Sequence, residues 1–292
     1  MAGCGICSGR REGRMKIGLV INWNKKRAEV FVPKLVRWLE GQGAELIVLD
    51  LPAKGLGAKP ADKERIKAAD LVVALGGDGT LLRAVRMIGK AEKPIMGVNL
   101  GGLGFLTAFS INAARAGIKG FIRGDYAEER RMLLSARLGR RVGYALNDCA
   151  VNMGPSGRVV EISVYWKERF VNKFSGDGIV VATPTGSTAY SLAAGGPVVF
   201  PTMSAFVLTP LCPHALAARP VVLPADEPVV MELTGKSQKA IVTLDGQNRW
   251  LIRLGEHLTI RRADFAVRLV VPKGECYFDI LRNKLKWSGS QR

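Results

Sequence analysis

The sequence lacks long apolar segments. No stretch of the 292-residue chain approaches 18 uninterrupted apolar residues, and its first 15 residues are rich in Gly, Cys and Arg. A membrane-spanning helix needs about 20 apolar residues, and a signal peptide needs an apolar central region. We therefore expect a cytoplasmic protein with no membrane partner.

Cysteine is also scarce and unpaired in pattern. The five cysteines are Cys4, Cys7, Cys149, Cys212 and Cys276. An odd, scattered set without export signals indicates reduced thiols. Cys4 and Cys7 form a single C-x-x-C, and no second pair offers zinc spacing. We expect a disordered extension over residues 1–14 ahead of Met15, which is either dispensable or marks a misplaced start, and no protein metal site.

Several nucleotide and hydrolase motifs are missing. The chain has no G-x-x-x-x-G-K-[ST], no G-x-G-x-x-G and no G-x-S-x-G. These absences exclude a P-loop enzyme, the usual dinucleotide fingerprint and the nucleophile elbow of a hydrolase. Only two histidines occur, His214 and His257, and neither has an acid at an informative spacing.

Acidic residues are outnumbered by basic ones. The chain has 43 Lys and Arg against 25 Asp and Glu, a net charge of +18. Such an excess raises the local concentration of anions. Because there is no zinc-finger spacing, RNA-binding motif or basic helix with heptads, we expect small polyanions as partners and no specific nucleic acid.

The most informative motif that is present spans Gly76–Thr80, which reads G-G-D-G-T. It follows the apolar run 71–75 and precedes the amphipathic segment 81–88. This order places Asp78 at the carboxyl end of a buried parallel strand, where open α/β sheets bind ligands. Glycines tolerate positive φ and allow close approach of a phosphate, and the next helix adds positive potential. We expect a phosphate cradle of Gly76, Gly77 and Thr80, with Thr80 as helix cap and Asp78 free for acid–base work. The alternative is a plain turn capped by Asp78.

The order of elements indicates two domains. Apolar runs and helical patterns alternate up to about residue 125, which predicts a Rossmann-like parallel sheet with helices. The expected strands are 16–22, 44–49, 71–75 and 94–98, and the expected helices are 30–40, 63–68 and 81–88. Short β segments follow, which predicts a sandwich or layered β domain. They are 133–138, 145–153, 159–167, 178–183, 205–209, 220–223, 229–233, 239–244, 250–254 and 258–262. A helical pattern at 278–287 is expected to pack back on the first domain. The predicted boundaries are 15–125, 126–272 and 273–292.

A second constellation occupies residues 176–197. Asp177 lies between glycines at the start of a strand, and Thr183-Pro184-Thr185-Gly186 forms a turn that ends it. Hydroxyls, backbone amides and the ring of Tyr190 then follow, and such groups suit a purine edge and a ribose. The alternative is that these Ser and Thr residues only cap the next element.

These motifs together resemble the NAD kinase family. The matching segments, in order, are 76–80, 99–107, 147–148, 175–178, 183–197 and 213–220. G-G-D-G alone also occurs in diacylglycerol, sphingosine and phosphofructokinases, whereas its combination with T-P-T-G-S-T-A-Y is highly specific. The resemblance covers nearly the whole chain from Lys16 onward.

The resemblance implies transfer of the γ-phosphoryl of ATP, or of polyphosphate, to the 2′-hydroxyl of the adenosine ribose of NAD. It also implies a divalent cation, Mg²⁺, carried with the nucleotide, and a homodimer or homotetramer formed through the β-rich domains. By this likeness Asp78 is the general base. The implied substrate-binding residues are Gly79, Arg83, Asn147, Asp148, Arg158, Asp177, Thr188, Ala189, Tyr190, Ser191, Leu192, Ala193 and Gln247.

Two departures and two rival functions remain. Many bacterial members have Glu at the position of Asp148, and many have a different pair where this chain has Ser175-Gly176. A lipid kinase would need an apolar acyl slot, whereas the segment 183–190 is polar. A dinucleotide sensor would have no use for Asp78 as a base.

Overall fold

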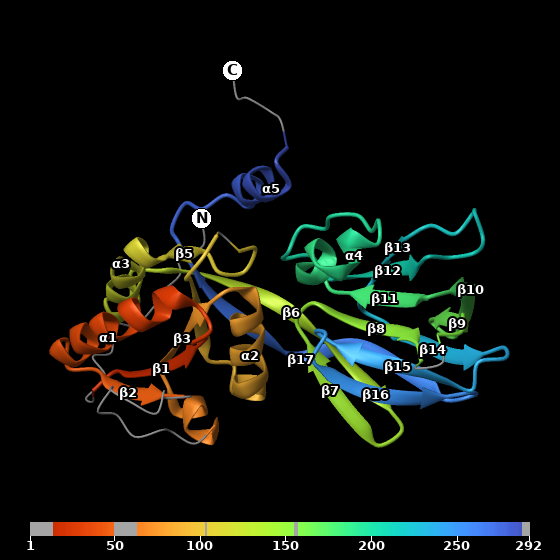
Figure 1. Ribbon diagram of the computed structural model, residues 1–292, viewed down its shortest axis with the longest axis horizontal. Coiled ribbons are helices and arrows are strands. Elements are labelled where there is room, and N and C mark those ends of the chain that lie inside the picture. The colour runs from red at the N-terminus through yellow and green to blue at the C-terminus, as the bar shows by residue number, and fades with distance from the viewer. Residues whose placement is uncertain (1–13, 50–62, 103, 155–156, 288–292) are drawn as a thin grey trace, which may run out of the picture.

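The computed structural model describes residues 14–49, 63–102, 104–154 and 157–287. Two halves lie side by side, an α/β half and a β-rich half, joined by long strands (Figure 1). The expected α/β-plus-β fold class is confirmed. Residues 1–13, which make up nearly all of the predicted extension, lie outside the described residues.

The α/β half is a three-layer structure. Its parallel strands follow the order β4-β3-β1-β2. Their bounds are β1 Lys16–Ile21, β2 Glu45–Val48, β3 Leu71–Gly76 and β4 Pro94–Asn99, with a short β5 Phe109–Ser110 beside β4. Helices α1 (Lys26–Gly41) and α3 (Ile111–Ile122) cover one face, and α2 (Asp78–Ile88) and the 3₁₀ helix η1 (Lys63–Ala68) cover the other. A short 3₁₀ turn, η2 (Gly89–Ala91), follows α2.

Helices α1, α2 and α3 differ from the prediction, and α1 begins at Lys26 rather than at Val30. Helix α3 was not predicted, although Ser110 caps it by accepting a hydrogen bond from the Ala113 amide at 3.3 Å. Helix α2 begins at Asp78 rather than at Leu81. The motif therefore includes the first turn of the helix.

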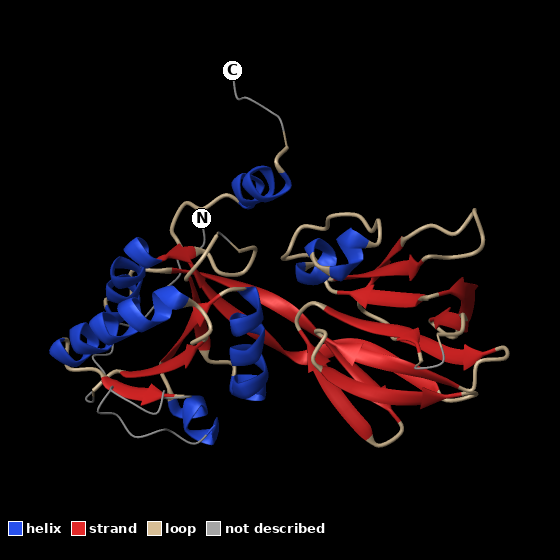
Figure 2. Cartoon of the chain, in the orientation of Figure 1, coloured by secondary structure: helices blue, strands red, loops and turns tan. Residues whose placement is uncertain are grey.

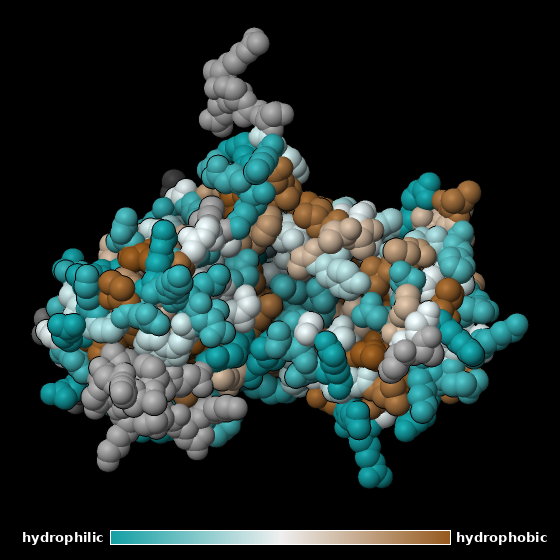
Figure 3. Space-filling view, viewed as in Figure 1, coloured by the Kyte–Doolittle hydropathy of each residue, from teal (hydrophilic) through white to brown (hydrophobic). Residues whose placement is uncertain are grey.

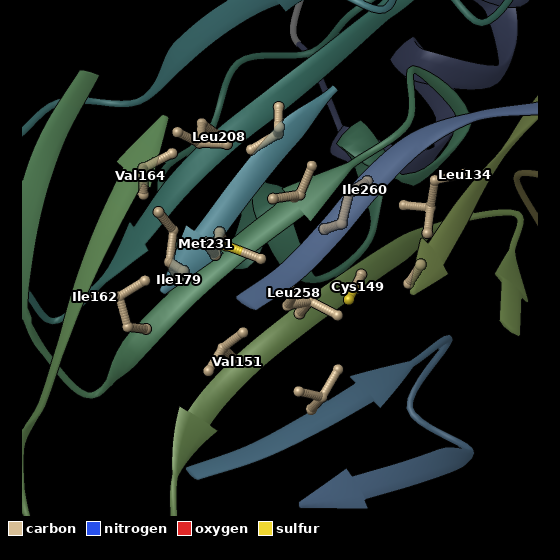
Figure 4. Packing of buried hydrophobic residues seen from close by; sticks show 14 of the residues in the cluster. Leu134, Cys149, Val151, Ile162, Val164, Ile179, Leu208, Met231, Leu258 and Ile260 are labelled. Carbon is tan, nitrogen blue, oxygen red and sulfur yellow. The ribbon is translucent and has the colours of Figure 1, made fainter. Parts of the chain in front are cut away.

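The β-rich half consists of two packed sheets. One is a separate antiparallel sheet of order β13-β12-β11-β8-β15-β16. Its strands are β8 Asp148–Met153, β11 Gly178–Ala182, β12 Ala205–Leu211, β13 Val221–Pro224, β15 Lys239–Leu244 and β16 Asn248–Arg253. Figure 4 shows side chains such as Cys149, Ile179, Ile162 and Met231 packed between the sheets. The outer face of β8 and β11 is covered by η3 (Thr185–Thr188) and α4 (Tyr190–Ala193).

Two long strands connect the halves. Strand β17 (His257–Val271) pairs antiparallel with β6 (Ala127–Leu138) along nearly its full length, with a bulge between Arg262 and Ala266. Its first part also pairs with β14, and its last part pairs in parallel with β4. The large sheet therefore has 11 strands and runs through both halves. Its remaining members are β7 Arg141–Ala145, β9 Val160–Trp166, β10 Arg169–Gly176 and β14 Val229–Thr234.

The strand predictions were too short or merged at several points. The predicted segments 133–138 and 258–262 are parts of the long strands β6 and β17, and β10 was not predicted. The predicted strand 145–153 is two strands, β7 and β8, interrupted at Leu146 and Asn147. This interruption lies in the candidate site described below.

The C-terminal helix α5 (Tyr277–Leu285) extends beyond the two halves (Figure 2). The Lys284 ammonium lies 5.8 Å from the centre of the Phe105 ring, and Tyr277 contacts Phe200. The C-terminal helix therefore has one contact to a loop of the α/β half and one to the β-rich half. The predicted packing of residues 273–292 on the first domain stays a prediction. Hydrophilic side chains predominate on the face in Figure 3, with apolar ones gathered beside α5. Within the described residues, every helix is too short or too polar to span a membrane.

Candidate active site

Asp78 is held by four hydrogen bonds from one loop. Its Oδ2 accepts the Phe105 amide at 2.9 Å, and its Oδ1 accepts the Leu106 amide, the Thr107 amide and the Thr107 hydroxyl, each at 3.1 Å. Gly104 lies against the same carboxylate, and a Cβ there would collide with it. A carboxylate has about four lone-pair positions, so Oδ2 keeps one position for a further partner.

The expected role of Thr80 as a cap is wrong. The N-cap is Gly77, which makes no side-chain cap hydrogen bond, and Thr80 is buried against Gly76 in the first turn. Asp78 has a structural role that the sequence did not show, because its carboxylate anchors the loop at residues 105–107. The expectation that the motif uses positive φ is also wrong, because positive φ occurs at none of its glycines, Gly76, Gly77 and Gly79.

Close approach to this motif is nevertheless possible. A Cβ added at Gly77 or Gly79 would meet nothing within 4 Å, and Gly79 is exposed. Gly76 and Thr80 are buried. Of the predicted phosphate cradle, only Gly77 is thus open. The neighbouring Gly79 is also open, and both lie at the positive end of α2.

The second set of predicted residues lies on the outer face of β8 and β11. These strands are antiparallel, with Ala182 opposite Asp148 and Gly178 opposite Asn152. Asp148 and Asp177 therefore lie toward opposite ends of the pair, five residues or roughly 17 Å apart along the strands at the usual rise. The Tyr190 hydroxyl lies 3.5 Å from Asn152 Oδ1. Burial, with Cys212, Asp148 and Asp177 nearby, raises the pKa of Tyr190.

The turn after β11 supports this surface. The Thr183 hydroxyl donates to the Leu146 carbonyl at 2.5 Å, and the Thr183 amide donates to the Asn147 carbonyl at 2.8 Å. Gly186 fits against Asn147, where a Cβ would collide with the backbone. Thr188 and Ala189 are half-buried next to Tyr190, whose side chain is 44% exposed. Hence the structure brings these predicted residues together.

Asp245 is an additional residue that the sequence reasoning missed. Its Oδ2 accepts the Leu146 amide at 3.1 Å, and its Oδ1 accepts the Asn147 and Asp148 amides at 2.8 and 3.3 Å. These amides point to Asp245 instead of a neighbouring strand, which explains the break between β7 and β8. The only sequence signal was an Asp-Gly pair at a turn close to the predicted Gln247.

Asp148 and Asp245 form a buried pair of carboxyl groups. Asp148 is 5% exposed and Asp245 is 9% exposed. Burial, and then the neighbouring Asp245, raise the pKa of Asp148 from 3.8 to about 7. Burial also raises the pKa of Asp245, against the lowering effect of its three amide donors and of Arg86. Asp148 can therefore change its charge near neutral pH.

The other predicted residues are placed less directly. Ser191 is fully buried and its hydroxyl lies 2.7 Å from Thr209 Oγ1, so it points into the molecule. Arg83 lies one turn after Asp78, and burial and Arg86 lower its pKa. Arg158 and Gln247 are exposed in connecting segments. Leu192 is half-buried and Ala193 exposed in α4.

Comparison with known proteins gives the same assignment for both halves. Residues 17–126 match the ATP-NAD kinase N-terminal domain, and residues 146–271 match the ATP-NAD kinase C-terminal domain. An NAD kinase of Solibacter usitatus is 39% identical over 278 residues, covering 92% of this chain and 96% of the relative. The chain belongs to the NAD kinase family. An NAD kinase of Geobacter metallireducens is 37% identical, with 93% and 98% of the two chains covered.

Solved structures of NAD kinases also share this fold. A yeast NADH kinase in complex with NADH has a TM-score of 0.84 at 25% identity, covering 97% of this chain and 90% of that one. An NAD kinase from Archaeoglobus fulgidus in complex with ATP has a TM-score of 0.77 at 26% identity, covering 94% and 100%. The enzyme assignment and the fold therefore agree.

Proposed function

We propose that this NAD kinase transfers the γ-phosphoryl of ATP to the 2′-hydroxyl of the adenosine ribose of NAD. The observation that carries the proposal is the Asp78 carboxylate, which is fixed by four donors and keeps one acceptor position on Oδ2. It lies at the N-terminus of α2 beside the open Gly77 and Gly79. The solved relatives with NADH and with ATP support both substrates.

Asp78 would act as the general base. The 2′-hydroxyl donates its hydrogen to the remaining lone pair of Oδ2. Asp78 takes the proton as the oxygen bonds to the γ-phosphorus, while the bond from that phosphorus to the bridging oxygen breaks and ADP leaves with the bond's electron pair. The Thr107 hydroxyl and three loop amides hold the carboxylate in one orientation during this step. General-base catalysis typically contributes about 10²- to 10⁴-fold to the rate.

The phosphoryl group would be positioned by the start of α2. The amides of Gly77 and Gly79 lie in the first turn, where backbone N–H groups and the helix dipole favour negative charge. Arg83 lies one turn further along. Phosphoryl transfer depends mainly on positioning and charge neutralisation, which this arrangement would supply.

NAD would lie along η3 and α4, between the two ends of the β8–β11 pair, because the outer face of these strands is itself covered. In this proposal the adenine stacks on Tyr190 next to Thr188 and Ala189, and Asn147 and Asp148 bind the adjacent ribose. Asp177 at the far end of the strand pair would contact the nicotinamide half. Leu192 and Ala193 would line the rim, and Ser191 would support it from inside through Thr209.

Mg²⁺ is proposed to enter with ATP as part of the substrate. In the portion of the chain that the structure describes, no group of three or more His, Cys, Asp or Glu residues is arranged to hold a metal ion. A cation that keeps several waters and binds phosphate oxygens does not require such a group. The use of polyphosphate as donor and the cytoplasmic location stay predictions.

A homodimer or homotetramer is also proposed. Strand β10 is the edge of the large sheet, carries Phe170 at 59% exposure and ends next to Asp177. A subunit contact at this edge would place a neighbour close to the nicotinamide end. Light scattering should show an oligomer, and a fully active 31.6 kDa monomer at assay concentration would contradict it.

The activity is tested by incubating the purified chain with NAD, Mg²⁺ and either ATP or polyphosphate. We expect NADP carrying the phosphate only at the adenosine 2′ position, identified by chromatography and phosphorus NMR. A reaction with dispersed diacylglycerol separates lipid kinase activity. The absence of NADP with every donor, from protein shown to be folded, would rule the proposal out.

A further inference from the structure

A cavity lies next to the segment that presents Asn147 and Asp148, because Leu146 and Asp245 both line it. It has a volume of about 230 Å³ and is lined by residues of α2 and of the strands β6, β7 and β17. None of the predicted substrate-binding residues lines it. An engineered cavity of about 150 Å³ is large enough to bind benzene, so this one has room for a larger ring system.

The cavity presents one polar donor and one polar acceptor of opposite charge. Arg86 lines it, and Arg86 Nη1 is buried with no hydrogen-bond partner among the described residues. A buried donor without an acceptor is unfavourable, so a ligand that supplies an acceptor would stabilise this group. Asp245 also lines the cavity, and its three amide donors leave one lone-pair position on Oδ2.

These charges select against an ionic ligand. An anion would be attracted by Arg86 but repelled by Asp245, and a cation would face the reverse. A neutral molecule with a hydrogen-bond acceptor next to a donor matches both groups. The Asn248 amide, which also lines the cavity, can serve as either partner.

Part of the lining is aromatic. The rings of Tyr144 and Phe265 lie 4.9 Å apart between centroids at an angle of 72°, and both line the cavity. The Lys90 ammonium lies 5.9 and 5.8 Å from the two ring centres on the outside. Faces of this kind favour a flat ring.

We propose that this cavity binds a neutral nitrogen heterocycle of nucleobase size. An amino group on the ring would donate to Asp245 Oδ2, and an adjacent ring nitrogen would accept from the Arg86 guanidinium. Six-aminopurines have this edge, either as a free base or as the base of a nucleotide. The site would contact both halves of the enzyme, because α2 carries Asp78 eight residues before Arg86 and Asp245 holds the Leu146–Asp148 amides.

The test is calorimetric titration of adenine into the full chain saturated with NADP, which occupies the proposed substrate surface. We expect one adenine per chain, and at least tenfold weaker binding of purine, which lacks the amino group. Arg86→Met removes the donor, and Val142→Trp fills the cavity from a side chain that is 43% exposed. Both variants should weaken adenine binding at least tenfold, whereas Arg137→Met, at an exposed position of β6, should not.

The controls separate this proposal from the proposed function. NADP is titrated first, so a failure of that step counts against the substrate assignment alone. The effect of Arg86→Met and Val142→Trp on adenine binding still shows whether adenine binds in the cavity. Displacement of bound adenine by ATP would identify a nucleotide as the source, and no displacement would identify a free base. Absence of saturable adenine binding, equal binding of purine, or unchanged binding in folded Arg86→Met and Val142→Trp would overturn the proposal.

Discussion

Two carboxylates, one in each half, use the same backbone arrangement. Asp78 accepts the amides of Phe105, Leu106 and Thr107, and Asp245 accepts the amides of Leu146, Asn147 and Asp148. In each case three consecutive N–H groups converge on one side chain and fix a segment that carries site residues. The two carboxylates differ in their access to solvent.

This difference in exposure fits a catalytic role for Asp78 and a structural role for Asp245. Asp78 is half-buried and lies between two glycines whose side-chain positions are open, so a substrate can approach it. Asp245 is 9% exposed and lies beneath the strand break that presents Asn147 and Asp148. The same arrangement therefore allows a base in the α/β half and a scaffold in the β-rich half. We expect changes near Asp78 to lower kcat and changes near Asp245 to raise KM for NAD.

The largest expected effect is that of Asp78→Asn. The amide cannot take the proton, so kcat should fall by about 10²- to 10⁴-fold. One oxygen is replaced by an NH₂ group that cannot accept the loop amides, so the free energy of unfolding should also fall, by about 1–3 kcal/mol. Steady-state kinetics and urea denaturation measure the two effects.

A matched variant, Thr107→Val, separates the catalytic role of Asp78 from its role in holding the loop at residues 105–107. It removes the hydroxyl that donates to Asp78 and leaves the carboxylate in place. It should lower stability but reduce kcat less than tenfold. If both variants reduce kcat equally, Asp78 acts only by holding the loop.

Asp245→Asn should chiefly affect stability and substrate binding. Asparagine keeps one acceptor oxygen, so at least one of the three amides loses its partner, at a cost of about 1–3 kcal/mol. The Asn147–Asp148 segment would then move, and KM for NAD should rise several-fold with little change in kcat. Asp226→Asn, at an exposed carboxylate, is the control. An unchanged KM in a destabilised protein would show that Asp245 supports the fold but not the substrate surface.

The sequence predicted one of these carboxylates and missed the other for a physical reason. Asp78 was recognisable because its glycines adjoin it in the chain and its strand reads as a buried apolar run. The partners of Asp245 are backbone amides 97 to 99 residues away, and a backbone amide leaves no mark in the sequence. The segment 145–153 was therefore predicted as one strand, where the structure has the end of β7 and the separate strand β8.

The same limit applies to the fold. Periodicity found most elements of the α/β half because each helix or strand is defined by its own residues. It could not show that β6 and β17 continue through both halves, because the pairing of β17 with β4 and of β6 with β17 exists only in three dimensions. The hydrogen bonds from Phe105 to Asp78, 27 residues away, were hidden for the same reason.

Tyr190→Ala tests the proposed NAD-binding surface without changing the segments 105–107 and 146–148, which Asp78 and Asp245 hold. Loss of a stacked aromatic face should weaken NAD binding by roughly 1–3 kcal/mol, the range for bases stacked on aromatic side chains. KM should therefore rise more than kcat falls. Stability should hardly change, because the side chain is 44% exposed. A titration with unchanged NAD affinity would place the adenine elsewhere.

The most pH-dependent effect is expected for Asp148→Asn. The folded state raises the pKa of Asp148 from 3.8 to about 7, by burial and by Asp245, so between these values it holds a proton that the unfolded chain has released. Stability should therefore decrease as pH rises from about 4 to about 7 and stay lower above it. Asparagine removes this dependence, so the variant should match the parent near pH 4 and exceed it at pH 8 by about 1–4 kcal/mol, since each pKa unit is worth about 1.4 kcal/mol. Urea denaturation across this range measures the difference, with Asp226→Asn again as the exposed control. If the variant keeps the pH dependence of the parent, Asp148 is not the group that causes it. Burial and the neighbouring Asp245 would then not be enough to keep Asp148 protonated in the folded enzyme.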